Sequence, residues 1–226
     1  MQSNVIIIGI DKKIGKGILE ECLNNPDINQ ILIINQPDYS SEFHSKITSI
    51  QLKDFNELKK YADLINNYKS CFYCDRLAIN SVSNEAYFAH NYTNTIAFAN
   101  ALVQINSAIN FCYISAAGTD HLEQSNQYSS RINGKIENAL NQIPFSAVYH
   151  FRPAIVQAKA QNATLGSTDK LLNFFYPILR TFNKSYFLTY AELAKAMIYV
   201  SIYGYNKHIL EIDDISFLAN EGDQLV

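Results

Sequence analysis

Short apolar runs alternate along this chain with longer segments in which apolar residues recur at helical spacing. The apolar runs are too short for helices and rich in β-branched and aromatic residues, so they predict buried strands. They cover residues 5–8, 31–34, 70–74, 111–114 and 147–151, with a weaker alternating run at 47–52. The helical period covers residues 15–24, 55–66, 85–107 and 127–142. Strands that alternate with helices predict βαβ units, and therefore an α/β fold in which a mostly parallel sheet carries helices on both faces.

The chain changes character after Arg152-Pro153. The pattern there predicts, in order, a polar loop, two helices and a short strand. These cover residues 157–169, 170–182, 191–203 and 208–212. This part is too short and too intermittent for an independent domain. We therefore expect a single domain over 1–226, in which residues 153–226 form a small C-terminal cap.

The composition is that of a globular protein, since 48% of the 226 residues are hydrophobic and 17% are charged. Histidines and cysteines show no metal-ligand spacing. The net charge of −3 and the scattered lysines argue against binding to nucleic acid or to a membrane surface. No apolar stretch reaches the roughly 20 residues of a membrane span. The N-terminal segment lacks the features of a signal peptide, so we expect a cytoplasmic protein with reduced cysteines.

A glycine turn follows the first predicted strand and opens the first predicted helix. Gly9 and Gly15 hold the first and third positions of a G-x-x-G-x-x-G pattern, with Lys12 in the middle. Unpaired N–H groups and the positive end of the helix dipole favour a phosphate at such a helix start, and the glycines allow close approach of the backbone. Two roles stay open for Lys12: its side chain blocks the pyrophosphate, or its ammonium pairs with it. A third interpretation is a tight turn without a ligand.

The end of the second predicted strand carries Asn35-Gln36. An acidic residue there would favour NAD by bonding the ribose 2′-hydroxyl, and an arginine would favour NADP. Neither is present, so the sequence leaves the choice between the two cofactors open.

Further motifs occur in a familiar order. Lys53-Asp54-Phe55 follows the third strand, and Asn91 to Ala97 lie in the long helix. Ser115-Ala116-Ala117-Gly118 follows a strand, and another strand ends in Arg152-Pro153. In order and spacing, from about residue 4 to residue 215, these motifs resemble those of the atypical and extended short-chain dehydrogenase/reductases. The NmrA-like proteins and the Tat-interacting-protein oxidoreductases are the most similar groups.

The resemblance implies a doubly wound, Rossmann-like sheet that binds NAD or NADP and an unknown small molecule, with residues 153–226 on the substrate side. Asp54-Phe55 would lie beside the adenine, and Cys74-Asp75 on the nicotinamide side. The implied cofactor contacts are Gly9, Asp11, Lys12, Ile14, Gly15, Asn35, Gln36, Asp54, Phe55, Cys74 and Asp75.

The implied catalytic residues are Ser115 and Tyr128, but the Tyr-x-x-x-Lys motif of this family is incomplete. Ile132 stands four residues after Tyr128. Lys135 is seven residues away, about 10 Å along a helix, too far for direct contact. If Gly134 is aligned with the glycine that often follows the family's lysine, the pair becomes Ser129 and Asn133. Arg131 could replace the cation, although a guanidinium is poorly suited to proton transfer.

Cys71 and Cys74 form a C-x-x-C pattern within a predicted strand. A redox pair would sit at a helix N-terminus, whereas residues three apart in a strand point to opposite faces. We therefore expect two buried structural cysteines.

Three functions remain open. The first is an NAD(P)-dependent oxidoreductase or epimerase with non-standard catalytic groups. The second is a non-catalytic protein that senses a nucleotide or binds a partner, and the third is a Rossmann-like protein without a nucleotide. The chain has 15 tyrosines and 13 phenylalanines, mostly at core-like spacings. An exposed tyrosine surface in the last third could form a homodimer.

Overall fold

A computed structural model describes residues 2–34, 44–157 and 187–224. Its centre is a seven-stranded parallel sheet with strand order β3-β2-β1-β4-β5-β6-β9. The strands are β1 (Ser3–Ile8), β2 (Ile28–Ile34), β3 (Ile47–Ile50), β4 (Ser70–Tyr73), β5 (Asn110–Ile114), β6 (Ala147–Phe151) and β9 (Ile209–Leu210). The chain moves outward from β1 in one direction and from β4 in the other, so the predicted doubly wound, Rossmann-like α/β fold is confirmed.

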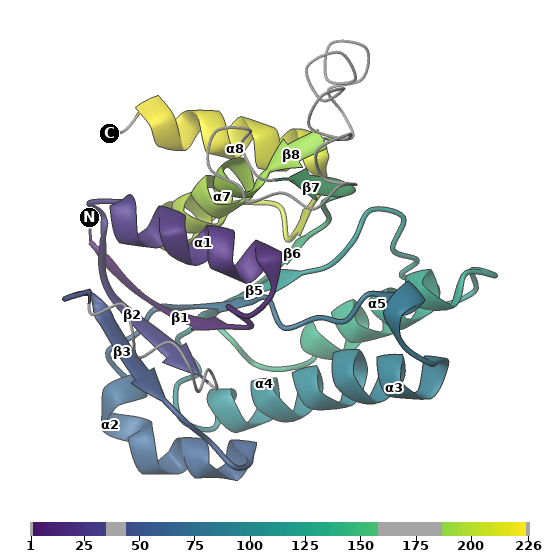
Figure 1. The fold of residues 1–226 in the computed structure, drawn as a ribbon, viewed down its shortest axis with the longest axis horizontal. Helices are drawn as coiled ribbons and strands as arrows, with labels where there is room; N and C mark the ends of the chain where they lie inside the picture. Colours follow the sequence, from purple (N-terminus) through teal and green to yellow (C-terminus); the bar gives the residue numbers. More distant parts are fainter. Residues whose placement is uncertain (1, 35–43, 158–186, 225–226) are drawn as a thin grey trace.

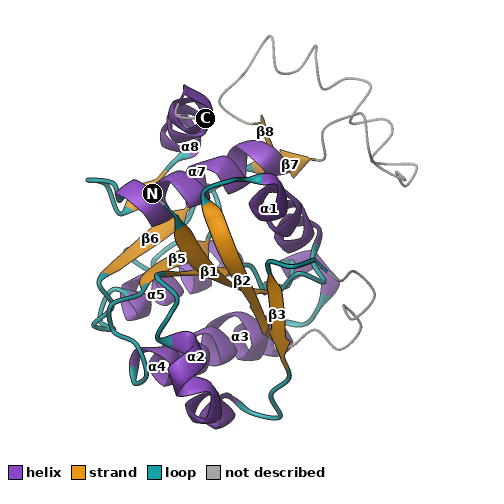
Figure 2. Ribbon diagram, turned by 90° about the vertical axis from the view of Figure 1, so that its left-hand side faces the viewer, coloured by secondary structure: helices purple, strands orange, loops and turns teal. Residues whose placement is uncertain are grey.

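Helices cover both faces of this sheet (Figures 1 and 2). One face carries α1 (Lys13–Asn24), α7 (Tyr190–Tyr203) and α8 (Ile212–Gln224). The other face carries α2 (Ala62–Ile65), α3 (Asn84–Phe88), α4 (Thr95–Val103) and α5 (Tyr128–Leu140). In β1, Val5 and Ile7 pack in the first layer and Ile6 and Ile8 in the second, which explains why this strand is apolar without alternation.

The predicted helix over 55–66 begins as a 3₁₀ helix, η2 (Phe55–Tyr61), and continues as α2. The predicted helix over 85–107 is a continuous series of α3, the π-helical segment η4 (Ala89–Asn94) and α4. A further short 3₁₀ turn, η3, covers Ile79–Ser81.

The C-terminal part contains elements that the sequence analysis did not predict. β7 (Ile155–Gln157) and β8 (Phe187–Thr189) form a separate parallel pair. The predicted strand over 208–212 is only the two residues of β9, and α8 begins at Ile212. The predicted helix over 170–182 and nearly all of the predicted loop over 157–169 lie outside the described residues. Of the helices described, none combines the length and the apolarity that crossing a membrane requires.

Candidate functional site

The carboxyl ends of the strands meet at one edge of the sheet. The strand order reverses between β1 and β4, and folds of this type bind their ligand between the loops that follow these two strands, a place called the crevice below. Residues 9–12, 74–77 and 115–120 lie at this edge, after β1, β4 and β5 respectively.

The glycine turn after β1 leaves no room for a side chain at its two glycines. Gly9 has φ +88°, and a Cβ atom there would lie 2.4 Å from the backbone nitrogen of Asp75. A Cβ atom on Gly15 would lie 2.1 Å from the carbonyl oxygen of Gly9. The turn is therefore pressed against the end of β4 and against the first turn of α1.

The N-terminus of α1 has no side-chain cap. Its cap residue, Lys12, makes no side-chain cap hydrogen bond, and the first turn holds no acidic residue. Ile14 is partly buried and packs against the core. The helix therefore presents backbone N–H groups and a positive dipole end at the crevice, which suits an anion.

The Lys12 ammonium lies among acidic side chains at this turn. Its Nζ is 2.5 Å from Asp11 Oδ2 and 3.9 Å from Asp75 Oδ1. The same Asp75 oxygen is 3.0 Å from His90 Nε2. These side chains are all partly exposed, so a negatively charged group at the turn would compete with the two carboxylates for Lys12.

The other residues assigned to the cofactor occupy varied positions. One Asp54 oxygen accepts from the Asn56 backbone N–H at 2.7 Å and so caps η2. The Phe55 ring packs edge-on against Phe98 at 5.4 Å. Cys74 is 3% exposed and belongs to the core. Asn35 and Gln36 lie outside the described residues.

Ser115 belongs to a buried network that the sequence analysis missed. Its Oγ donates to Glu137 Oε1 at 2.5 Å and is 3.1 Å from Thr119 Oγ1. Glu137 is 1% exposed, and both of its carboxylate oxygens accept from Arg152, from Nε at 3.0 Å and from Nη2 at 2.6 Å. Arg152 Nη1 also donates to Glu211 at 3.0 Å. The network therefore links the ends of β5, β6 and β9 to α5.

Tyr128 and Lys135 have separate partners. The Tyr128 hydroxyl donates to the Asn84 carbonyl at 3.1 Å. The Lys135 ammonium lies over two aromatic rings, 5.9 Å from Phe88 and 5.4 Å from Tyr92. No hydrogen bond among the described residues joins Tyr128 to Ser115, so the two implied catalytic hydroxyls serve different contacts.

Asn133 takes the lysine position in the alignment on Gly134. Its side chain also has hydrogen-bond partners within the protein. Its Oδ1 accepts from Arg76 Nη2 at 2.7 Å and from the Tyr87 hydroxyl at 3.1 Å. Arg76 Nη1 donates to the Ser115 carbonyl at 2.5 Å. Arg76 thereby connects the ends of β4 and β5 to α5. The sequence offered only one hint of its role: it follows directly on the predicted Cys74-Asp75 pair.

The C-x-x-C prediction is confirmed. Cys71 and Cys74 pack in opposite core layers, and both are free and buried. Burial raises the pKa of each thiol well above its usual value. The part of the chain that the structure covers holds no group of three or more His, Cys, Asp or Glu residues that could bind a metal ion.

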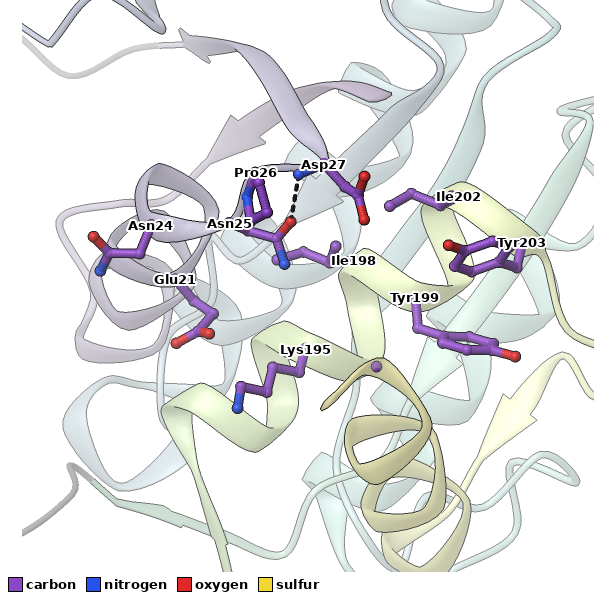
Figure 3. A pocket seen from close by; sticks show the side chains of 11 residues that line it. Glu21, Asn24, Asn25, Pro26, Asp27, Lys195, Ile198, Tyr199, Ile202 and Tyr203 are labelled. Atoms are coloured by element: carbon purple, nitrogen blue, oxygen red, sulfur yellow. Dashed lines mark hydrogen bonds between the residues drawn. The ribbon is translucent and has the colours of Figure 1, made fainter. Parts of the chain in front are cut away.

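A cavity of about 170 Å³ lies at the opposite edge of the sheet (Figure 3). The Asn24–Asp27 turn lines one side of it, and Tyr199 and Tyr203 of α7 line another. The glycine turn lies at the N-terminal end of α1, and the cavity lies at the C-terminal end of the same helix. A helix of 12 residues is about 18 Å long, so about this distance separates the turn from the cavity. The cavity is therefore separate from the crevice.

No protein-family model matches the sequence, and neither does any curated protein. Solved structures do match. The Bordetella bronchiseptica enzyme WbmF in complex with NAD⁺ is 15% identical, with a TM-score of 0.64 over 99% of this chain and 78% of that chain. The UDP-N-acetylglucosamine 4-epimerase from Methanobrevibacter ruminantium M1 is 16% identical, with a TM-score of 0.59 over 99% and 82%. The reductase domain of PhqB from Penicillium fellutanum is 14% identical, with a TM-score of 0.65 over 94% and 67%. At this level of identity the likeness establishes the fold.

Proposed function

We propose that this protein binds NAD or NADP across the carboxyl edge of its sheet and acts on a small molecule as an oxidoreductase or epimerase of the short-chain dehydrogenase/reductase type. One observation carries the proposal. The turn leaves no room for a side chain at Gly9 and Gly15, and it leads into the N-terminus of α1, which has no side-chain cap, beside the point where the strand order reverses. Complexes of WbmF with NAD⁺ and with NADH, and of WbmF with NAD⁺ and UDP, support it.

The residues present fit a dinucleotide. The N–H groups at the start of α1 would hold the pyrophosphate, with Lys12 beside it. Asp54 and Phe55 would lie on the adenine side, and Cys74 and Asp75 on the nicotinamide side. When bound, the cofactor would supply the hydride acceptor or donor.

The proposed catalytic site differs from the standard one. Asn133 in the lysine position cannot act as the cation that lowers a tyrosine pKa. In this proposal the protein belongs with the atypical members of the group, such as the NmrA-like proteins, and any turnover depends on groups other than Tyr-x-x-x-Lys.

A second candidate is a non-catalytic protein that senses the nucleotide or binds a partner. The observation that favours it is that each implied catalytic side chain already contacts another group of the protein. Ser115 donates to Glu137, Tyr128 to a backbone carbonyl, and the Lys135 ammonium lies on aromatic rings. Consumption of NADH with a panel of carbonyl compounds, or epimerisation of a UDP-sugar, would exclude this candidate.

The first test is titration of the purified protein with NADH and NADPH, by calorimetry or by enhancement of nicotinamide fluorescence. Micromolar binding of either would support the proposal and identify the preferred cofactor. Absence of binding at millimolar concentrations would contradict it and leave the glycine turn as a purely structural feature.

The role of Lys12 can be measured in the same titration. Without its ammonium, a bound pyrophosphate would lose the cation that lies between it and the Asp11 and Asp75 carboxylates. We therefore expect Lys12→Ala to weaken binding about tenfold, the effect of one charged hydrogen bond. Lys16→Ala, which removes an exposed lysine of the same helix, is the matched control and should change binding little. Tighter binding by Lys12→Ala would mean instead that the side chain blocks the phosphate.

A further inference from the structure

Arg76 is a partly buried cation whose hydrogen-bond partners are all neutral. It donates to the Ser115 carbonyl at 2.5 Å and to Asn133 Oδ1 at 2.7 Å, and its Nη2 is 3.5 Å from the Tyr87 hydroxyl. Its guanidinium carbon also lies 5.6 Å from the centre of the Tyr113 ring. Within the described residues, no carboxylate forms an ion pair with it.

The buried carboxylate of Glu137 attracts Arg76 through space, but its hydrogen bonds go to Arg152 and Ser115. Both oxygens of Glu137 accept from Arg152, and one of them also accepts from Ser115. Glu211, the second partner of Arg152, has a side chain 51% exposed and is screened by solvent. Among the described groups of this network, the guanidiniums of Arg152 and of the partly buried Arg76 face one buried carboxylate, a local excess of one positive charge, while Asp75 lies beside Lys12 and His90. An uncompensated buried charge is unfavourable.

The guanidinium of Arg76 also has more N–H donors than hydrogen-bond partners. A guanidinium carries five N–H groups, and the partners above are three oxygens. Nε is buried and has no hydrogen-bond partner in the part of the chain that is described. The residue directly follows Asp75, at the end of the crevice assigned to the nicotinamide.

We infer that Arg76, at the carboxyl ends of β4 and β5, forms a subsite for a carboxylate group of the small molecule on which the protein acts. A monoanion matches the local excess of one positive charge, and a carboxylate oxygen can accept from the donors of the guanidinium that have no partner, Nε–H among them. The assignment of this carboxylate to a substrate rests on the proposed function. Binding of the anion itself does not require the dinucleotide. A phosphate of the cofactor is the other possible source of negative charge, and the test separates the two.

The chain contains only four arginines, Arg76, Arg131, Arg152 and Arg180, so arginine Nε–H signals can be resolved one by one. Protein labelled with ¹⁵N-arginine would be titrated with acetate, with acetamide as a neutral control of the same shape, and with inorganic phosphate. We expect acetate to shift the Arg76 Nε–H signal in a saturable way, with a dissociation constant of about 10 mM or tighter. Acetamide should leave it unchanged.

Variants assign the signal and control the effect. Arg76→Gln should abolish the saturable acetate response, whereas Arg131→Gln, whose side chain donates to the Ser125 carbonyl, should retain it. Arg76 connects three elements, so the substitution could prevent folding. In that case the wild-type titration decides alone. A response to phosphate but not to acetate, or no saturable response, would overturn the inference.

A titration of the same sample with NADH separates the two proposals. NADH binding without an acetate response at Arg76 would refute the carboxylate subsite and leave the proposed function intact. An acetate response without NADH binding would refute the proposed function and leave the anion site.

Discussion

His150 makes the stability of this protein sensitive to acid. It lies in β6 with no exposed surface, and its Nε2 is 2.8 Å from Asn141 Oδ1. Nδ1 is buried and has no hydrogen-bond partner among the residues described. Burial lowers the pKa of His150 to about 4, with Glu137 opposing this shift and Arg152 and His208 adding to it. The imidazole is therefore neutral in the folded protein at pH 7 and stays so down to about pH 4.

The unfolded chain takes up a proton on the same residue near pH 6.5. Between pH 6.5 and 4 the unfolded state therefore binds more protons than the folded state, and the free energy of unfolding falls as the pH falls. The pKa of His150 differs by about 2.5 between the two states, which at about 1.4 kcal/mol per pKa unit gives a full effect of about 3.5 kcal/mol. About 3 kcal/mol of this is lost by pH 4, because the folded imidazole is half protonated there. That is a large share of the roughly 5–15 kcal/mol by which most proteins are stable.

Urea unfolding followed by circular dichroism at several pH values between 7 and 4 would measure this effect. We expect the unfolding free energy of the wild type to fall more steeply than that of His150→Leu, with the two curves diverging by about 3 kcal/mol over the range. His121→Leu, which removes an exposed imidazole, should keep the wild-type slope. Equal slopes for wild type and His150→Leu would refute the reasoning.

Two further predictions concern buried groups. Glu137→Gln leaves Arg152 buried without its main carboxylate and should lower the free energy of unfolding by about 3–5 kcal/mol. Glu211→Gln, at the half-exposed end of the same network, should change it by less than about 1 kcal/mol in the same urea titration. The four cysteines are all buried and free, so native protein should show no rapidly reacting thiol with a disulfide reagent such as DTNB, and denatured protein should show four. A fast-reacting thiol in the native protein would contradict the buried positions.

Local pattern was sufficient to predict most of the sheet. The strands β1, β2, β4, β5 and β6 are apolar because helices cover both faces, and such runs are visible in the sequence. The pair β7 and β8 was missed because each strand has only three residues. Helix α8 could have been found, since Ile212, Ile215, Leu218 and Ala219 follow a helical spacing and are buried.

The candidate site was less accessible to sequence reasoning. The glycine turn was predictable because its φ and its close contacts demand glycine at fixed spacing from a strand and a helix. Arg76, Glu137 and Arg152 were not, because their hydrogen bonds and ion pairs join residues up to 59 positions apart, and such contacts depend on how the strands are ordered. The predicted contacts at Asn35 and Gln36 remain predictions.

The π-helical segment η4 lies between α3 and α4. Because its turns are wider than those of an α-helix, the side chains of α3 leave the helix at a different angle relative to those of α4 than in an uninterrupted α-helix. The wide turn of η4 places Asn91 fully inside, where its amide exchanges two hydrogen bonds with the backbone of Leu77, at 2.9 and 3.0 Å. Leu77 follows Arg76, so this one side chain holds the loop after β4 in register with the helix. Deleting any single residue of η4 would restore regular α-helical winding and remove the wide turn that places Asn91 inside. The chain should therefore tolerate substitutions on the outer side of this segment far better than a change in its length.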